Sequence, residues 1–140
     1  MKSVVPLFFL IGFLLAACAS QGTPEGTSQK VTVSGGSYTD VSVPELQTML
    51  ASKDFLFVNV HIPFEGDLPN TDLSIPFDQI AQNLEQLPSE KDAKIVLYCR
   101  SGNMSTQAAQ TLVELGYTNV WNLAGGFNAW QAAGLPMEGE

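Results

Sequence analysis

Basic residues, histidine and cysteine are all scarce in this chain of 140 residues. Six Lys and Arg residues stand against 14 Asp and Glu, the formal net charge is −8, and the basic residues form no cluster. Nucleic-acid-binding proteins carry basic patches, and anionic lipid surfaces attract basic segments, so neither is expected as an electrostatic partner. The length allows one domain with a substantial core but not two.

The first of the two cysteines, Cys18, ends an N-terminal targeting segment. Lys2 precedes a short apolar run that closes on small residues, and this run fits a signal sequence better than a membrane span. The tetrad LAAC (15–18) resembles a bacterial lipobox, which implies that residues 1–17 are a signal peptide and that Cys18 is lipidated. The alternative is an ordinary secretory signal with an incidental cysteine.

Lipidation would tether the protein to a membrane of the cell envelope without spanning it. Ala19 and Ser20 carry no acidic retention signal, so in a Gram-negative host the expected address is the periplasmic side of the outer membrane. Residues 18–37 are rich in Gly, Ser and Thr, and we expect the lipidated cysteine followed by a flexible tether. With Cys18 used for lipid, Cys99 is the remaining thiol, and no intramolecular disulfide is possible.

Residues 38–140 read as one α/β domain in which strands alternate with helices. The expected architecture is a doubly wound, mainly parallel, five-stranded sheet flanked by helices. The apolar and β-branched runs predict strands at 38–43, 55–60, 73–76, 93–99 and 118–124. The helical patterns lie at 44–54, with Pro44 in the first turn, at 79–87, with Asp78 as N-cap, and at 103–116 and 125–134.

Cys99 comes at the end of a buried strand and opens the loop CRSGNMS. Ligands of such sheets bind beyond the carboxyl ends of the strands, where Cys99 lies. The loop amides and the start of the next helix converge on an anion at this point, and this environment favours a thiolate. Ser101 and Ser105 add hydrogen-bond donors, and Arg100 adds a positive charge. The alternative is a buried thiol that merely ends a core strand.

The segment IVLYCRSGNMS resembles the active-site segment of the rhodanese family, small α/β domains that carry sulfane sulfur as a cysteine persulfide. VWNLAGGFNAWQAAGLPME is similar to the closing segment of that family, and FLFVNVHIPFEG to an earlier strand and turn. The resemblance covers residues 38–137. It implies that Cys99 is the nucleophile and that a loop of backbone amides cradles the transferred sulfur; this loop comprises Arg100, Ser101, Gly102, Asn103, Met104 and Ser105.

Two positions depart from the family pattern. Met104 stands where the loop usually has Arg, which removes an anchor for an anionic donor such as thiosulfate. Asn59-Val60-His61 replaces the common Asp-Val-Arg, which puts in question an ion pair whose expected partner is Glu65. His61 ends its strand at the ligand edge and is a candidate pocket residue, with a satisfied structural histidine as the alternative.

Two further readings concern the loop and its surroundings. Phosphatases of the Cys-x5-Arg type need Arg at position 105, where this chain has Ser105, so the clamp for a phosphate dianion is missing. Gly125 and Gly126 let the backbone approach closely, and Phe127 is a candidate rim residue of the pocket, although aromatic residues at this spacing are more often core.

The predicted function is that of an exported sulfurtransferase that moves sulfur from a thiosulfate- or polysulfide-type donor to a thiophilic acceptor. The alternative is a non-catalytic rhodanese-like binding or sensing module. We expect a monomer that needs no cofactor or metal, with a small sulfur-containing anion or persulfide as donor, a thiol as acceptor, and contact with the membrane through the lipid alone.

Overall fold

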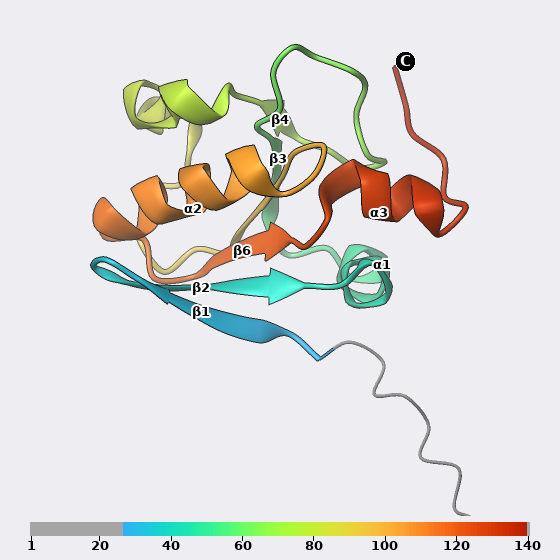
Figure 1. Ribbon diagram of the computed structural model, residues 1–140. Coiled ribbons are helices and arrows are strands. Elements are labelled where there is room, and N and C mark those ends of the chain that lie inside the picture. The colour runs from blue at the N-terminus through green and yellow to red at the C-terminus, as the bar shows by residue number, and fades with distance from the viewer. Residues whose placement is uncertain (1–26, 140) are drawn as a thin grey trace, which may run out of the picture.

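A central sheet with helices on both faces forms the core of the computed structural model, which describes residues 27–139 (Figure 1). The predicted signal peptide, Cys18 and residues 19–26 lie outside the described residues. The strands are β1 (Gln29–Val33), β2 (Gly36–Val41), β3 (Leu56–Asn59), β4 (Leu73–Ser74), β5 (Ile95–Tyr98) and β6 (Val120–Leu123). The α-helices are α1 (Val43–Ala51), α2 (Asn103–Glu114) and α3 (Gly126–Ala132).

The sheet has the order β1-β2-β6-β5-β3-β4, and every neighbouring pair except β1 and β2 is parallel. This confirms the mostly parallel α/β sheet flanked by helices. Residues of α2 pack on one face of the sheet, in a cluster with β3 and β5 side chains such as Val58 and Leu97. Residues of α1 and α3 pack on the other face, against Phe57 and Tyr98. The carboxyl ends of β3 and β5 therefore meet at one edge, which is where the Cys99 loop begins.

The described chain has six strands rather than the predicted five, because part of the expected tether is a strand. Gln29–Val33 pairs antiparallel with β2, from Gln29 opposite Asp40 to Val33 opposite Gly36. Gly35, at φ +84°, makes a tight turn within the segment that the composition predicts to be a flexible tether. Val31 and Val33 pack against the core. The predicted tether over 18–37 is therefore wrong for residues 29–37.

The helix predicted at 79–87 is also wrong, since this segment forms two 3-10 helices, η1 (Phe77–Gln82) and η2 (Leu84–Gln86). Pro76 rather than Asp78 precedes η1, and no side chain caps its first turn. Asn83, at φ −123°, interrupts the helical backbone between the two turns. Ile80 is the buried residue of η1, so the segment is held by packing without continuous helical hydrogen bonding.

Helix α1 begins with a capping box between Ser42 and Glu45. The Ser42 hydroxyl accepts from the Glu45 amide, and the Glu45 carboxylate accepts from the Ser42 amide. Pro44 lies in the first turn, as predicted.

Across residues 27–139, no helix combines the length and apolar character needed to cross a membrane.

Candidate active site

Cys99 follows β5 directly and is 1% exposed. Two donors lie within hydrogen-bond distance of its Sγ: the amide of Gly102 at 3.0 Å and the hydroxyl of Ser105 at 3.4 Å. A sulfur that receives a backbone N–H and a hydroxyl at the start of a helix lies where negative charge is stabilised. The thiol therefore ends a core strand and also faces two hydrogen-bond donors.

Gly102 turns the chain from the strand into α2. It has φ +103°, a left-handed conformation that glycine adopts without strain, and its carbonyl accepts from the Thr106 amide at 3.0 Å. The Ser105 hydroxyl lies 3.2 Å from the same carbonyl. Because a hydroxyl has one proton, Ser105 donates either to Gly102 or to the sulfur, and an anionic sulfur attracts that proton.

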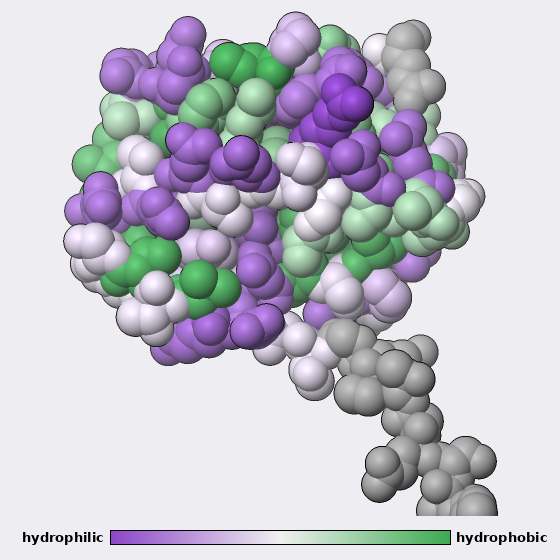
Figure 2. Space-filling model, in the orientation of Figure 1, coloured by the Kyte–Doolittle hydropathy of each residue, from purple (hydrophilic) through white to green (hydrophobic). Residues whose placement is uncertain are grey.

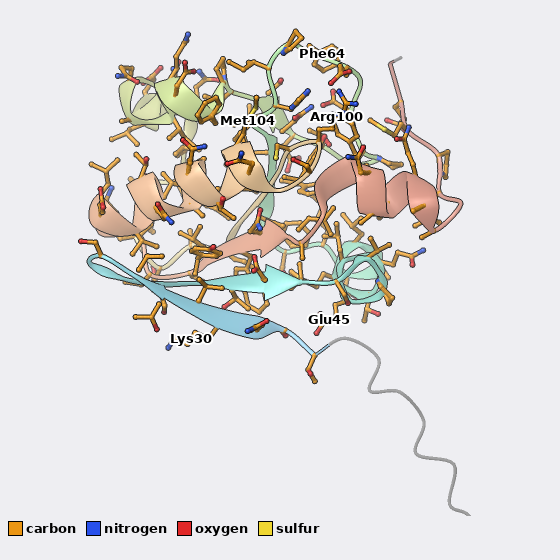
Figure 3. All side chains as sticks on the ribbon, viewed as in Figure 1. Lys30, Glu45, Phe64, Arg100 and Met104 are labelled. Atoms are coloured by element: carbon orange, nitrogen blue, oxygen red, sulfur yellow. The ribbon has the colours of Figure 1, made fainter. Side chains whose placement is uncertain are left out.

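The other residues of the predicted loop point in different directions. Arg100, Ser101 and Asn103 are exposed, whereas Met104 is half-buried and packs against the core. Figure 2 shows the most hydrophilic colour on the part of the surface where Figure 3 labels Arg100, with Met104 labelled near it. Among the described contacts of the loop residues 100–105, the sulfur receives one side-chain donor, from Ser105, and one backbone donor, from Gly102.

Helix α3 supports the loop from behind. The amide of Phe127 donates to the Cys99 carbonyl at 2.9 Å, and the amide of Asn128 donates to the Arg100 carbonyl at 3.0 Å. A Cβ added at Gly126 would lie 2.1 Å from the Cys99 carbonyl oxygen, so only glycine permits this approach. The close approach expected at Gly125 and Gly126 is confirmed at Gly126, whereas a Cβ at Gly125 would meet Ala129 of α3 itself.

His61 and Phe127 are both buried and contact each other. Their rings are nearly perpendicular with centroids 5.3 Å apart, and they are 7% and 4% exposed. Phe127 is therefore a core residue rather than a rim residue, because its ring packs against His61 while its amide holds the loop. His61 Nε2 pairs closely with a Glu65 carboxylate oxygen. Its Nδ1 has no hydrogen-bond partner within the described part of the chain.

Glu65 also faces the Cys99 loop, since its second carboxylate oxygen lies 3.5 Å from Arg100 Nη1. Glu65 is the expected partner of the arginine that the family usually has at position 61, and in this structure it pairs with His61 instead. The link from Glu65 to Arg100 was not predicted. A carboxylate four residues after His61 is visible in the sequence, but Arg100 is brought to it by the parallel pairing of β3 and β5.

Asn59 holds the segment that carries His61 and Glu65. Its side-chain amide donates to the Gly66 carbonyl at 3.0 Å and to Asp67 at 2.9 Å, and its oxygen accepts from the His61 amide at 3.0 Å. An aspartate at this position could accept but not donate, so asparagine suits a turn that presents acceptors. The sequence shows that Asn59 departs from the family pattern, but it does not reveal this role.

Tyr98 anchors the far end of the same segment. Its buried hydroxyl accepts from the Leu68 amide at 2.9 Å and hydrogen-bonds with Thr71 at 2.8 Å. Burial is the main cause that raises the pKa of Tyr98 above its usual range, and the nearby Asp67 carboxylate acts in the same direction. Tyr98 therefore remains a neutral structural group beside the nucleophile.

The fold and the cysteine loop define a small single-cysteine α/β domain, and comparison with known proteins identifies its family. Residues 45–133 match the rhodanese-like domain, and the chain belongs to this family. It is 37% identical over 94 residues to a sulfurtransferase of Allochromatium vinosum, across 65% of this chain and 85% of the relative. It is 47% identical over 47 residues to the thiosulfate sulfurtransferase GlpE of Actinobacillus succinogenes, across 34% of this chain and 42% of that relative.

Solved structures agree with this assignment. The human single-domain sulfurtransferase TSTD1 superposes with a TM-score of 0.60 at 29% identity, over 66% of this chain and 95% of that one. A rhodanese-related protein from Thermoplasma volcanium gives a TM-score of 0.59 at 28% identity, over 70% of this chain and 95% of that one. The mostly parallel sheet with helices on both faces is therefore the rhodanese-like fold.

Proposed function

We propose that this protein is a sulfurtransferase that carries sulfane sulfur as a persulfide on Cys99. The observation that carries the proposal is the pair of donors on Cys99 Sγ, the Gly102 amide and the Ser105 hydroxyl, at the first turn of α2. The family membership and the sulfurtransferases among the relatives support it. The alternative, a non-catalytic binding or sensing module, uses the same loop without covalent sulfur.

The reaction has two half-reactions. In the first, the Cys99 thiolate attacks the outer sulfur of the donor, a new S–S bond forms, and the old bond to the carrier breaks with its electron pair leaving on the carrier. In the second, a thiophilic acceptor attacks the outer sulfur of the Cys99 persulfide and the thiolate is released. The loop donors stabilise the anionic sulfur at both stages, because they are held in place before the reaction begins.

The donor is proposed to be a thiosulfate- or polysulfide-type compound and the acceptor a thiol or similar thiophile. Support for this class comes from the loop, which offers hydrogen-bond donors to a single anionic sulfur. Ser105 in place of a second arginine leaves no bidentate clamp for a phosphate dianion. The GlpE relative is named for thiosulfate, and Met104 at the loop position usually held by Arg makes thiosulfate the weaker candidate here.

Intact mass measurement tests the proposal. The reduced protein is incubated with thiosulfate or with polysulfide, desalted and weighed, and Cys99→Ser serves as the matched control. A gain of one sulfur atom in the parent and none in Cys99→Ser is expected. An unchanged mass with both donors, in a protein shown to be folded and reduced, would refute the proposal and favour a non-catalytic binding module.

We also propose that the domain is held at the cell envelope by a lipid on Cys18. The described chain begins next to α1, where the Ser28 hydroxyl donates to Glu45 at 3.0 Å. Figure 3 labels Lys30 and Glu45 on the opposite side of the molecule from Arg100 and Met104. An anchor on that side would leave the Cys99 loop facing away from the membrane. Incorporation of labelled palmitate that is lost in Cys18→Ala tests this; equal labelling of both proteins would refute it.

A further inference from the structure

Arg100 is the one basic residue of the loop 99–105, and a carboxylate lies against its side chain. Arg100 Nη1 is 3.5 Å from Glu65 Oε1, and the two side chains are 56% and 40% exposed. Because Arg100 directly follows the nucleophile, its charge would otherwise be available to an approaching anion. The paired carboxylate offsets that charge, so the Arg100 side chain adds little net attraction for an anion that approaches Cys99.

Glu65 is held in this position by buried neighbours. Its other carboxylate oxygen pairs with Nε2 of His61, whose ring packs on Phe127. The carboxylate can only accept, so Nε2 carries the proton. The backbone before and after Glu65 is fixed by the three hydrogen bonds of the Asn59 side chain. An isolated surface ion pair is weak and mobile, but a carboxylate anchored on a buried imidazole stays near Arg100.

Two apolar residues flank this pair along the chain, since Phe64 precedes Glu65 and Met104 follows Arg100 in the loop. Met104 is half-buried on the first turn of α2, and Phe64, next to Glu65, is 54% exposed. Figure 3 labels Phe64, Arg100 and Met104 on the same side of the molecule. We call the side chains of Phe64, Glu65, Arg100 and Met104 the Cys99 rim. The rim thus combines a neutralised ion pair with two apolar groups.

We propose that Glu65 is a specificity-determining residue which, by neutralising Arg100, selects persulfides with an apolar carrier over dianionic donors. This inference rests on the proposed sulfur transfer to Cys99. With thiosulfate, the thiolate takes the outer sulfur and sulfite leaves with two negative charges. With an alkyl persulfide, the thiolate takes the terminal sulfur and the alkyl thiolate leaves with one. Only the first donor brings a second negative charge past Glu65.

The test is Glu65→Gln, which removes the charge and leaves an amide oxygen that accepts from His61. The rate of sulfur loading is measured as kcat/KM with thiosulfate and with an alkyl persulfide whose carrier is uncharged. Taking about 8 Å between the Glu65 carboxylate and the charge of the donor in a water-like dielectric, the loss of one negative charge raises kcat/KM about sixfold for a dianion and about twofold for a monoanion. The ratio of thiosulfate to persulfide loading should therefore rise more than twofold.

Three further variants isolate the cause. Glu114→Gln removes the same charge at the last residue of α2, far from the loop, and should leave the ratio unchanged. In the double variant Glu65→Gln/Arg100→Gln the ratio of thiosulfate to persulfide loading should return to the parent's value, because the positive charge that attracts the dianion is removed together with the carboxylate. Glu65→Ala removes the charge without an amide beside His61, and it replaces Glu65→Gln if that variant does not fold.

The outcomes separate the two proposals. If the parent protein takes no sulfur from either donor, the proposed function fails and this inference fails with it. If the parent loads from the persulfide but a folded Glu65 variant has the parent's ratio, the inference about Glu65 is wrong and the proposed function stands. A rise that also appears in Glu114→Gln would show that total charge, not the Cys99 rim, governs the choice of donor.

Discussion

Gly126→Ala is the substitution whose effect can be worked out most directly from the structure. The new Cβ would lie 2.1 Å from the Cys99 carbonyl oxygen and 2.7 Å from the carbonyl carbon and oxygen of Arg100. These are backbone atoms at the end of a buried strand and cannot rotate away. Helix α3 therefore has to move back from the loop by about 1 Å to restore a normal van der Waals separation.

The expected cost has two parts. The hydrogen bonds from the Phe127 and Asn128 amides, of 2.9 and 3.0 Å, lengthen or break, and each contributes about 0.5–1.5 kcal/mol. Gly126 has φ +55°, where a residue with a Cβ costs about 1–2 kcal/mol. The sum is about 2–5 kcal/mol, which is a large share of the roughly 5–15 kcal/mol that stabilises a domain of this kind.

Gly134→Ala is the matched control, because Gly134 also has positive φ, +78°, but a Cβ there meets nothing within 4 Å. Urea unfolding followed by tryptophan fluorescence gives both free energies of unfolding. We expect Gly134→Ala to lower the free energy of unfolding by about 1–2 kcal/mol and Gly126→Ala to lower it clearly more. Without urea, at a temperature where both variants are folded, Gly126→Ala should also load sulfur more slowly than Gly134→Ala. Equal losses in the two variants would refute the claim that α3 supports the loop through a contact only glycine allows.

Three other predictions follow from single contacts. Met104→Arg places a cation on the Cys99 loop and should raise thiosulfate turnover more than polysulfide turnover in steady-state assays; equal changes would mean that this position does not select charge. Tyr98→Phe leaves the buried Leu68 amide without its acceptor and should lower the free energy of unfolding by about 1–3 kcal/mol, whereas a change below about 0.5 would contradict the role of the hydroxyl. Partial burial raises the pKa of Glu45, but hydrogen bonds from Ser42 outweigh this effect and the net pKa is lowered. The ionised carboxylate therefore stabilises the fold above the ordinary carboxyl pKa, and this stabilisation is lost as pH falls through the pKa of the folded state. Glu45→Gln should therefore be less stable than the parent at neutral pH and equal to it in acid, and a gap that persists in acid would contradict this assignment.

The buried strands could be predicted from sequence because their composition is distinctive. The runs around Phe57 and Val96 are apolar on both faces, which is typical of parallel strands covered by helices on each side. The position of Cys99 at the carboxyl edge follows from that reading. The likeness of the loop to the rhodanese family then indicated the nucleophile, and the adjacent glycines Gly125 and Gly126 indicated a close approach of the backbone.

The parts that escaped prediction depend on contacts between distant residues. Strand β1 has few apolar residues, and it forms because Val31 and Val33 reach the core once Gly35 turns the chain. The 3-10 turns around Ile80 have a helical pattern in sequence, but prolines at both ends and tertiary packing decide their backbone. The approach of Arg100 to Glu65 depends on the β3–β5 register, and sequence spacing alone does not reveal it.

The central claim, that Cys99 carries the transferred sulfur, is tested most directly by following one sulfur atom through both half-reactions. Protein loaded with donor that is isotopically labelled in its outer sulfur is digested and the Cys99 peptide is weighed before and after addition of a thiol acceptor. The account predicts labelled persulfide on the Cys99 peptide, its loss on addition of acceptor, and recovery of the label on the acceptor. Label that never appears on this peptide, while the acceptor still gains sulfur in the presence of the folded protein, would contradict it.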